Sequence, residues 1–130
     1  MIPSLLAALA LTSAQVQAQA LAQPPVLDEL RLLGSQVALG QVCEAAELAS
    51  VEFEAMVPHA EALTSRAESE GMDKGAINDE QEHGYVTMMA QLEVRYPQGR
   101  DDPDFPKLIE DCEMLIKEHP TFFTPFVSQD

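Results

Sequence analysis

Two cysteines, Cys43 and Cys112, place the strongest constraint on how this chain can fold. Each lies on an apolar stripe with helical spacing: Cys43 follows Leu39 by four positions. Cys112 precedes Leu115 by three. Both side chains therefore face the interior side of a predicted helix. An even number of cysteines in an exported chain favours a bond between them. The sequence predicts a disulfide between an early helix and the last one, which stabilises the fold by at most about 4 kcal/mol.

The first twenty residues indicate that the chain is exported. An apolar run over residues 5–11 is followed by polar and small residues that end in Ala-Gln-Ala at positions 18–20. This order is typical of a signal peptide cut after its last small residue. Even residues 2–14 together are shorter than the roughly 20 residues that a membrane-spanning helix needs. We expect residues 1–20 to be a signal peptide and the mature protein to be periplasmic or secreted. The alternative is an uncleaved apolar helix.

The remaining chain carries apolar residues at helical spacing, and no segment alternates as a strand would. We predict an all-α fold, a small bundle of four to five helices tied by one disulfide. The bundle covers residues 28–120, after an extended arm at 21–27 and before an aromatic tail at 121–130. Its predicted helices are 28–46, 47–57 (a second helix or a bent continuation), 58–70, 79–96 and 104–119.

Local signals set these boundaries and indicate one close contact. Pro58 lacks a backbone donor, so we place it in the first turn of a helix. Asn78 is the expected N-cap of the next helix, and Asp104 that of the last. Gly34 and Ala38, one turn apart, would let another backbone approach closely; a ligand groove at these small residues is the alternative.

The net charge restricts the partners. The chain has 22 Asp and Glu against 7 Lys and Arg, a formal charge of −15. Such a surface repels nucleic acids and anionic lipid headgroups and favours cationic partners. We therefore expect no nucleic-acid binding, no membrane insertion of the mature form, and a protein partner, with a cationic one favoured. The alternative is that the charge serves solubility alone.

Motifs that would carry chemistry are missing. The sequence has no nucleophile elbow, zinc-protease motif, phosphate-binding glycine loop or C-x-x-C. The predicted disulfide also removes both thiols as nucleophiles. We expect no enzyme, no catalytic residues and no cofactor. Asp79, Glu80 and His83 share one side of a helix and are weak metal-ligand candidates. Acidic residues at a helix start are ordinary, so we predict no metal site there.

The C-terminal tail contains three phenylalanines, Phe122, Phe123 and Phe126, after Pro120. Pro120 ends the preceding helix. Rings left in water would form a partner-binding patch, which makes these three the candidate interaction residues. The alternative is that the tail folds back and covers the core.

The layout of a signal peptide, a small helical domain and two cysteines in distant helices resembles two groups of exported proteins. It is similar to that of periplasmic acid-stress chaperones of the HdeA type, although the cysteine spacing here is longer and a basic C-terminal region is missing. It is also similar to that of periplasmic immunity proteins. We predict a non-enzymatic, acidic protein-interaction module. An acid-stress chaperone, as the first resemblance implies, and a weak metal-binding protein are the alternatives.

Export and disulfide formation together make a prediction for the mass of the native protein. Cleavage after Ala20 leaves residues 21–130, which is 130 − 20 = 110 residues. Intact mass spectrometry of the protein recovered from its own cells should give this species, with no thiol that reacts with an alkylating reagent before reduction. A full-length chain with two reactive thiols would contradict both expectations.

Overall fold

The computed structural model describes residues 25–128, so the predicted signal peptide and residues 21–24 of the predicted arm lie outside the described part. Within it the chain forms four α-helices, which confirms the all-α class. They are α2 (Val26–Ala45), α3 (Phe53–Ser69), α4 (Lys74–Arg95) and α5 (Phe105–Glu118), with a short 3-10 helix, η1 (Gly99–Asp101).

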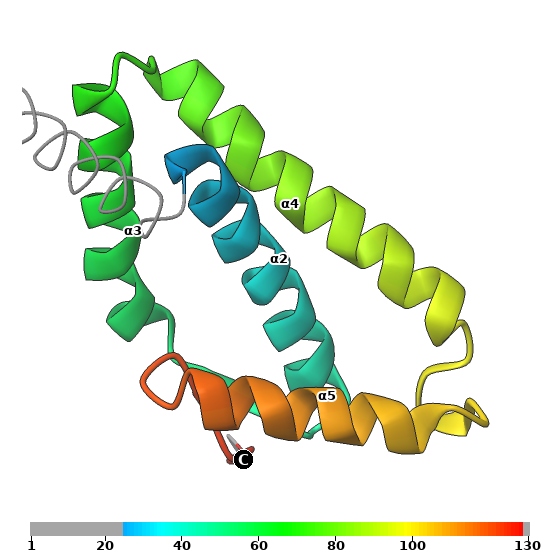
Figure 1. The fold of residues 1–130 in the computed structure, drawn as a ribbon. Coiled ribbons are helices and arrows are strands. Elements are labelled where there is room, and N and C mark those ends of the chain that lie inside the picture. Colours follow the sequence, from blue (N-terminus) through cyan, green and yellow to red (C-terminus); the bar gives the residue numbers. More distant parts are fainter. Residues whose placement is uncertain (1–24, 129–130) are drawn as a thin grey trace, which may run out of the picture.

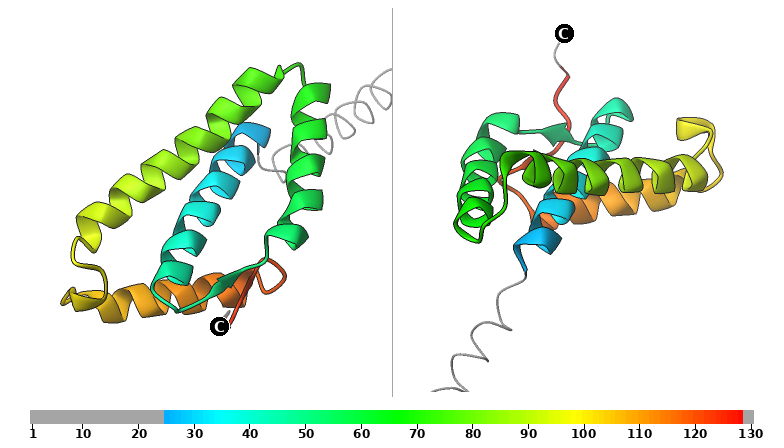
Figure 2. Two further views of the ribbon diagram at one scale, coloured as in Figure 1. Left: turned by 180° about the vertical axis from the view of Figure 1, so that it is seen from behind. Right: turned by 90° about the horizontal axis from the view of Figure 1, so that it is seen from above.

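Three of the helices lie beside one another, and the fourth crosses one end of them (Figure 1). In sequence order, α2, α3 and α4 run in alternating directions, so α2 and α4 point the same way. The helix α5 crosses the C-terminal end of α2 (Figures 1 and 2). The four helices fit the predicted small bundle roughly, with α5 crossing the end of the others (Figure 2).

The closest packing joins α2 to α4 at two glycines. A Cβ added to Gly34 would lie 2.0 Å from the backbone oxygen of Gln81, and one added to Gly84 would lie 2.0 Å from that of Arg31. On each helix, the absence of a side chain at the glycine therefore lets the backbone of the other helix come into direct contact. Gly34 is half of the predicted close-approach pair, and Ala38, the other half, is completely buried.

The predicted disulfide is present and fixes α5 to α2. Cys43 and Cys112 are completely buried, with an S–S distance of 2.10 Å and a Cα–Cα distance of 5.8 Å. Around them the core contains residues from all four α-helices and from both strands. Its fully buried members include Leu30, Ile77, Leu108 and Phe123.

The segment after α2 differs from the prediction because it forms a strand. We expected residues 47–57 to be helical and no sheet to form; residues 53–57 are helical, as the start of α3, but 47–52 are not. Glu47 instead adopts a φ of 60°, which turns the chain out of the helix. Strands β1 (Ser50–Val51) and β2 (Phe123–Thr124) then pair in antiparallel fashion. A pairing this short leaves no alternating pattern in the sequence, which explains why it was not predicted.

Three predicted helix starts were also placed too late. The helix α2 begins at Val26, so the last two residues of the predicted 21–27 arm are helical. Pro58 lies inside α3 and not at its start. The missing donor is tolerated there because Pro58 and Glu54, whose carbonyl would have accepted the bond, are both exposed to water. The cap of α4 is Asp73, whose carboxylate accepts from the Ala76 amide at 2.8 Å, and not Asn78.

The last helix follows the prediction closely. α5 begins after Asp104, has Pro106 in its first turn and ends at Glu118. The side chain of Asp104 makes no capping hydrogen bond. The loop before it is held by Asp102, a buried carboxylate that accepts from the amides of Gln98 and Asp104. None of the helices between residues 25 and 128 is long and apolar enough to cross a membrane.

The two-glycine crossing predicts a large effect of one methyl group. Gly34→Ala or Gly84→Ala should lower the free energy of unfolding by about 3 kcal/mol, because the helices must separate to admit the Cβ. Gly75→Ala is the matched control. A Cβ there would meet only the Asp73 side chain, at 3.3 Å. That variant should stay within about 1 kcal/mol of the wild type. Urea unfolding followed by circular dichroism measures all three. Equal stability of the Gly34 and Gly75 variants would contradict the close crossing.

Candidate functional site: a groove between three helices

An open apolar groove lies between α2, α3 and α4, with a cavity volume of about 440 Å³. We call it the α2–α3–α4 groove. Its lining is mainly aliphatic and aromatic, with amide, hydroxyl and carboxylate groups from α4. The lining residues from α2 and α3 are Leu33, Gly34, Val37, Phe53, Met56, Val57 and Ala60, and those from α4 are Asn78, Gln81, Glu82 and Tyr85.

The groove exists because α3 is held at its ends. At its start, Glu52, which directly follows strand β1, donates from its amide to the carbonyl of Phe122 at 2.8 Å. Near its end, Arg66 binds Glu29 of α2 through an ion pair. Between these points the facing side chains are not in full contact with α2 and α4. Phe53 and Val57 consequently remain 47% and 52% exposed, respectively.

A shallower hollow extends the groove along α3. It shares Val57, Ala60 and Gln81 with the main cavity. It adds Glu61, Thr64 and Ser65 from α3. The two hollows therefore form one continuous depression between α3 and α4, apolar at one end and more polar at the other.

The charges along the groove are all negative. Glu61 lies on the α3 side and Glu82 on the α4 side, and both are exposed. Within residues 25–128, no lysine or arginine is among the residues that line either hollow. A bound group with positive charge would therefore meet a carboxylate on each side of the groove.

Two arginines on the helices that form the groove, Arg31 and Arg66, are engaged by carboxylates. Arg31 of α2 donates from Nε to Glu80 of α4. This hydrogen bond, with the attraction of the same carboxylate, raises the pKa of Arg31 above its ordinary value. Arg66 is bound to Glu29 and lies 3.9 Å from Glu70. These pairs brace the helices and leave the carboxylates of the groove uncompensated.

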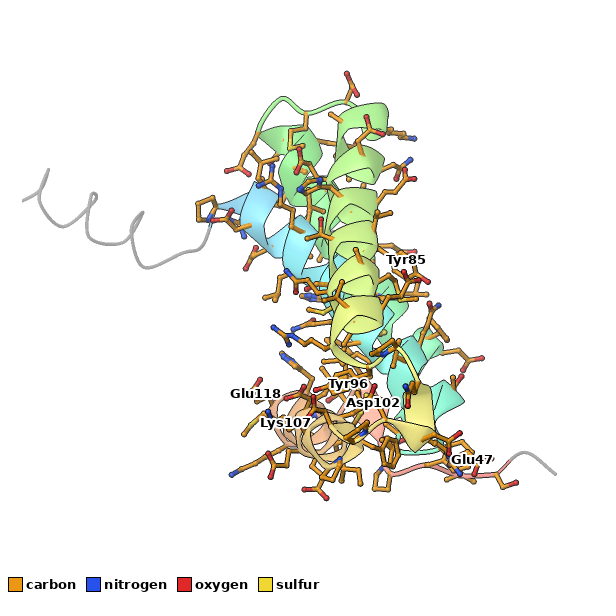
Figure 3. The ribbon with its side chains drawn as sticks, turned by 90° about the vertical axis from the view of Figure 1, so that its right-hand side faces the viewer. Glu47, Tyr85, Tyr96, Asp102, Lys107 and Glu118 are labelled. Atoms are coloured by element: carbon orange, nitrogen blue, oxygen red, sulfur yellow. A yellow bond between two sulfur atoms is a disulfide. The ribbon has the colours of Figure 1, made fainter. Side chains whose placement is uncertain are left out.

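Tyr85 forms the best-fixed polar contact in the groove. Its hydroxyl donates to Oε1 of Gln41 at 2.5 Å, which joins α4 to α2. Figure 3 shows Tyr85 partway along α4, well separated from Tyr96 at the end of that helix. The ring supplies an apolar wall, and its hydroxyl is held by the protein itself.

Tyr96 and Asp102 mark a second polar cluster, at the junction of α4 and α5 (Figure 3). The Tyr96 hydroxyl donates to Asp111 at 3.1 Å. Burial, followed by this hydrogen bond, raises the pKa of Tyr96. The contacts satisfy buried polar groups where the two helices meet, so we interpret this cluster as structural.

The weak metal candidates are not assembled into a site. Glu80 is bound to Arg31, while Asp79 and His83 are exposed. In the described part of the chain, no group of three or more His, Cys, Asp or Glu side chains is placed to hold a metal ion. Glu80, a weak metal-ligand candidate in the sequence, instead joins α4 to α2 through its ion pair with Arg31.

The aromatic tail packs against the core and does not form a patch of three exposed rings. Phe123 is completely buried, and an added Cβ on Gly40 would lie 2.4 Å from its ring. Phe122 and Phe126 are half-buried. The Phe122 ring contacts His59 of α3 and His119, at centroid distances of 5.3 and 6.3 Å. Phe123 is therefore a core residue and cannot serve as an exposed interaction residue in this structure.

The sequence indicated a groove only as an alternative at Gly34 and Ala38, and of these two Gly34 lines it. The α3 wall was missed because the start of that helix was placed at Pro58. With that boundary, Phe53 and Met56 belonged to a different helix from Ala60. A usable signal was present, since Phe53, Val57, Ala60 and Thr64 follow each other at spacings of three and four. No protein-family model, no curated protein and no solved structure matches the chain, so the site is interpreted from its own geometry.

Proposed function

We propose that this chain is a non-enzymatic protein-interaction module of the periplasm or the extracellular space, which binds a cationic partner protein through the α2–α3–α4 groove. One observation supports this function most directly. The groove is open and mainly apolar, and among residues 25–128 its only charged lining groups are carboxylates.

The openness of the groove favours a protein partner over a small molecule. Small-molecule sites bury most of their ligand in an enclosed cavity. Here Phe53 and Val57 keep about half of their surface in water, and the polar extension runs on along α3. Exposed apolar residues next to charged ones are typical of a protein–protein contact, in which the partner covers them.

The charge favours a basic partner. With a formal charge of −15, the chain attracts cationic proteins over distances of about 10 Å at ordinary ionic strength and speeds their association. It disfavours acidic proteins by the same interaction. The local carboxylates, Glu61 and Glu82, then act at contact distance.

An extracytoplasmic location is consistent with the cysteines. The disulfide between Cys43 and Cys112 is compatible with an oxidising compartment. Together with the apolar N-terminal segment and its Ala-Gln-Ala sequence at 18–20, it supports export of the chain.

Two arginine variants test this function. Ala60→Arg places a long cation in the groove, and Ala90→Arg places the same group on the exposed face of α4, outside either hollow. Wild-type protein isolated at low salt from the extracytoplasmic fraction of its own cells should carry a basic protein that about 0.5 M NaCl releases. Ala90→Arg should retain this partner, and Ala60→Arg should lose most of it. Circular dichroism confirms that both variants are folded.

Two results would contradict the proposed function. If no basic protein is released by salt from the wild-type preparation, the proposal of a cationic partner is contradicted. Equal retention of the partner by the two arginine variants would remove the groove as its binding site.

A further inference from the structure

We propose that the α2–α3–α4 groove receives one face of a basic amphipathic α-helix of about twelve residues, presented by the partner protein. The inference rests on the proposed function and specifies the form and chemistry of the segment that binds. Three features of the groove support this inference: the length of its lining, the hydrogen bonding of the backbone in its walls, and the position of its carboxylates.

The length of the lining fits a short helix. On α3 the lining residues extend from Phe53 to Ser65. At a rise of 1.5 Å per residue this stretch is about 18 Å long, the length of a helix of about twelve residues. A helix of three turns presents large apolar side chains at positions i, i+3 or i+4, and i+7 on one face. These would lie over Leu33, Val57 and Ala60 along the apolar part of the groove.

The backbone of the groove walls favours a helix over an extended peptide. All three walls are helices, in which the interior N–H and C=O groups are bonded within each helix except at the carbonyl of Glu54, whose helical donor is missing at Pro58. An extended segment gains affinity by pairing its backbone with the free edge of a sheet. The only sheet within residues 25–128 has two residues in each strand and pairs β1 with β2. A helix satisfies its own backbone and needs from the groove only apolar contact and charge pairing.

The carboxylates are placed to recognise the flanks of such a helix. Glu61 and Glu82 come from opposite sides of the groove, α3 and α4. An amphipathic helix with its apolar face in the groove carries lysine or arginine along the two edges of that face. Each edge would then meet one carboxylate. The amide groups of Asn78 and Gln81 are available to the same edge on the α4 side.

A model peptide tests the inference without knowledge of the natural partner. The probe is a capped peptide of about fourteen residues with leucine at i, i+3, i+4 and i+7 and lysine elsewhere. Its control is a scrambled peptide of the same composition, which has the same charge and no apolar face. Titration calorimetry should show the patterned peptide binding one to one and at least about tenfold more tightly than the scrambled one, and circular dichroism should show that it becomes helical on binding.

Paired variants locate the binding site. Glu61→Gln with Glu82→Gln should weaken binding about two- to fivefold at low salt and have no effect at about 0.5 M salt. The control is Glu68→Gln with Glu113→Gln, which removes the same charge from exposed positions outside the hollows and should have less than half that effect. Phe53→Ala with Val57→Ala should weaken binding about tenfold or more at both salt concentrations.

The results separate this inference from the proposed function. If the scrambled peptide binds as tightly, or the two glutamine pairs act equally, binding depends on diffuse charge. This result would contradict binding of an amphipathic helix in the groove, but not the proposed binding of a cationic partner protein. If neither peptide binds but the natural partner is retained by Ala90→Arg and lost by Ala60→Arg, the partner uses the groove without such a helix. If neither the peptides nor any basic protein binds, both the helix inference and the proposed function are contradicted.

Discussion

The direct contact between the backbones of α2 and α4 is the constraint on which the rest of the structure depends. Gly34 and Gly84 each receive the other helix at a distance that excludes a Cβ. This contact holds α2 and α4 side by side, and the two helices point the same way, with α3 beside them and meeting the start of α4 at one end (Figure 1). α3 faces these helices with Phe53, Met56 and Val57, and a groove lined by all three helices remains between them.

The opposite end of the molecule determines where α3 begins. The disulfide fixes α5 to α2, and the chain after α5 returns to place Phe123 in the core against Gly40. Strand β2 then pairs with β1, and α3 starts two residues after β1 ends. The tail that the sequence offered as an interaction surface therefore acts on the groove indirectly, by positioning its α3 wall. Phe122 extends this support through its contact with His59 on α3.

Features that depend on residues close together in the sequence were predicted, whereas most features that depend on contacts between distant segments were not. The cysteine pairing, the helical class and α5 were predicted because the apolar stripes, Asp104 and Pro120 are local signals. The close-approach role of Gly34 followed from its small size, whereas its partner Gly84 could not be identified without the pairing of the helices. The start of α3 was placed wrongly because Pro58 favours the first turn of a helix. The start of α4 was placed wrongly because Asn78 and Asp73 are comparable N-cap residues, and Asp73 is the one that caps the helix. The groove has side chains from three helices, so no single segment of the sequence contains it.

The central claim, that a basic amphipathic helix binds between α2, α3 and α4, is tested most directly by nuclear magnetic resonance. Amide spectra of nitrogen-15-labelled protein would be recorded while the patterned leucine–lysine peptide is added. The largest shift changes should fall within residues 53–65 and 78–85, which include the lining of the groove on α3 and α4, and amides on the outer face of α5 should change little. Changes spread evenly over the acidic surface, or concentrated on α5, would contradict it.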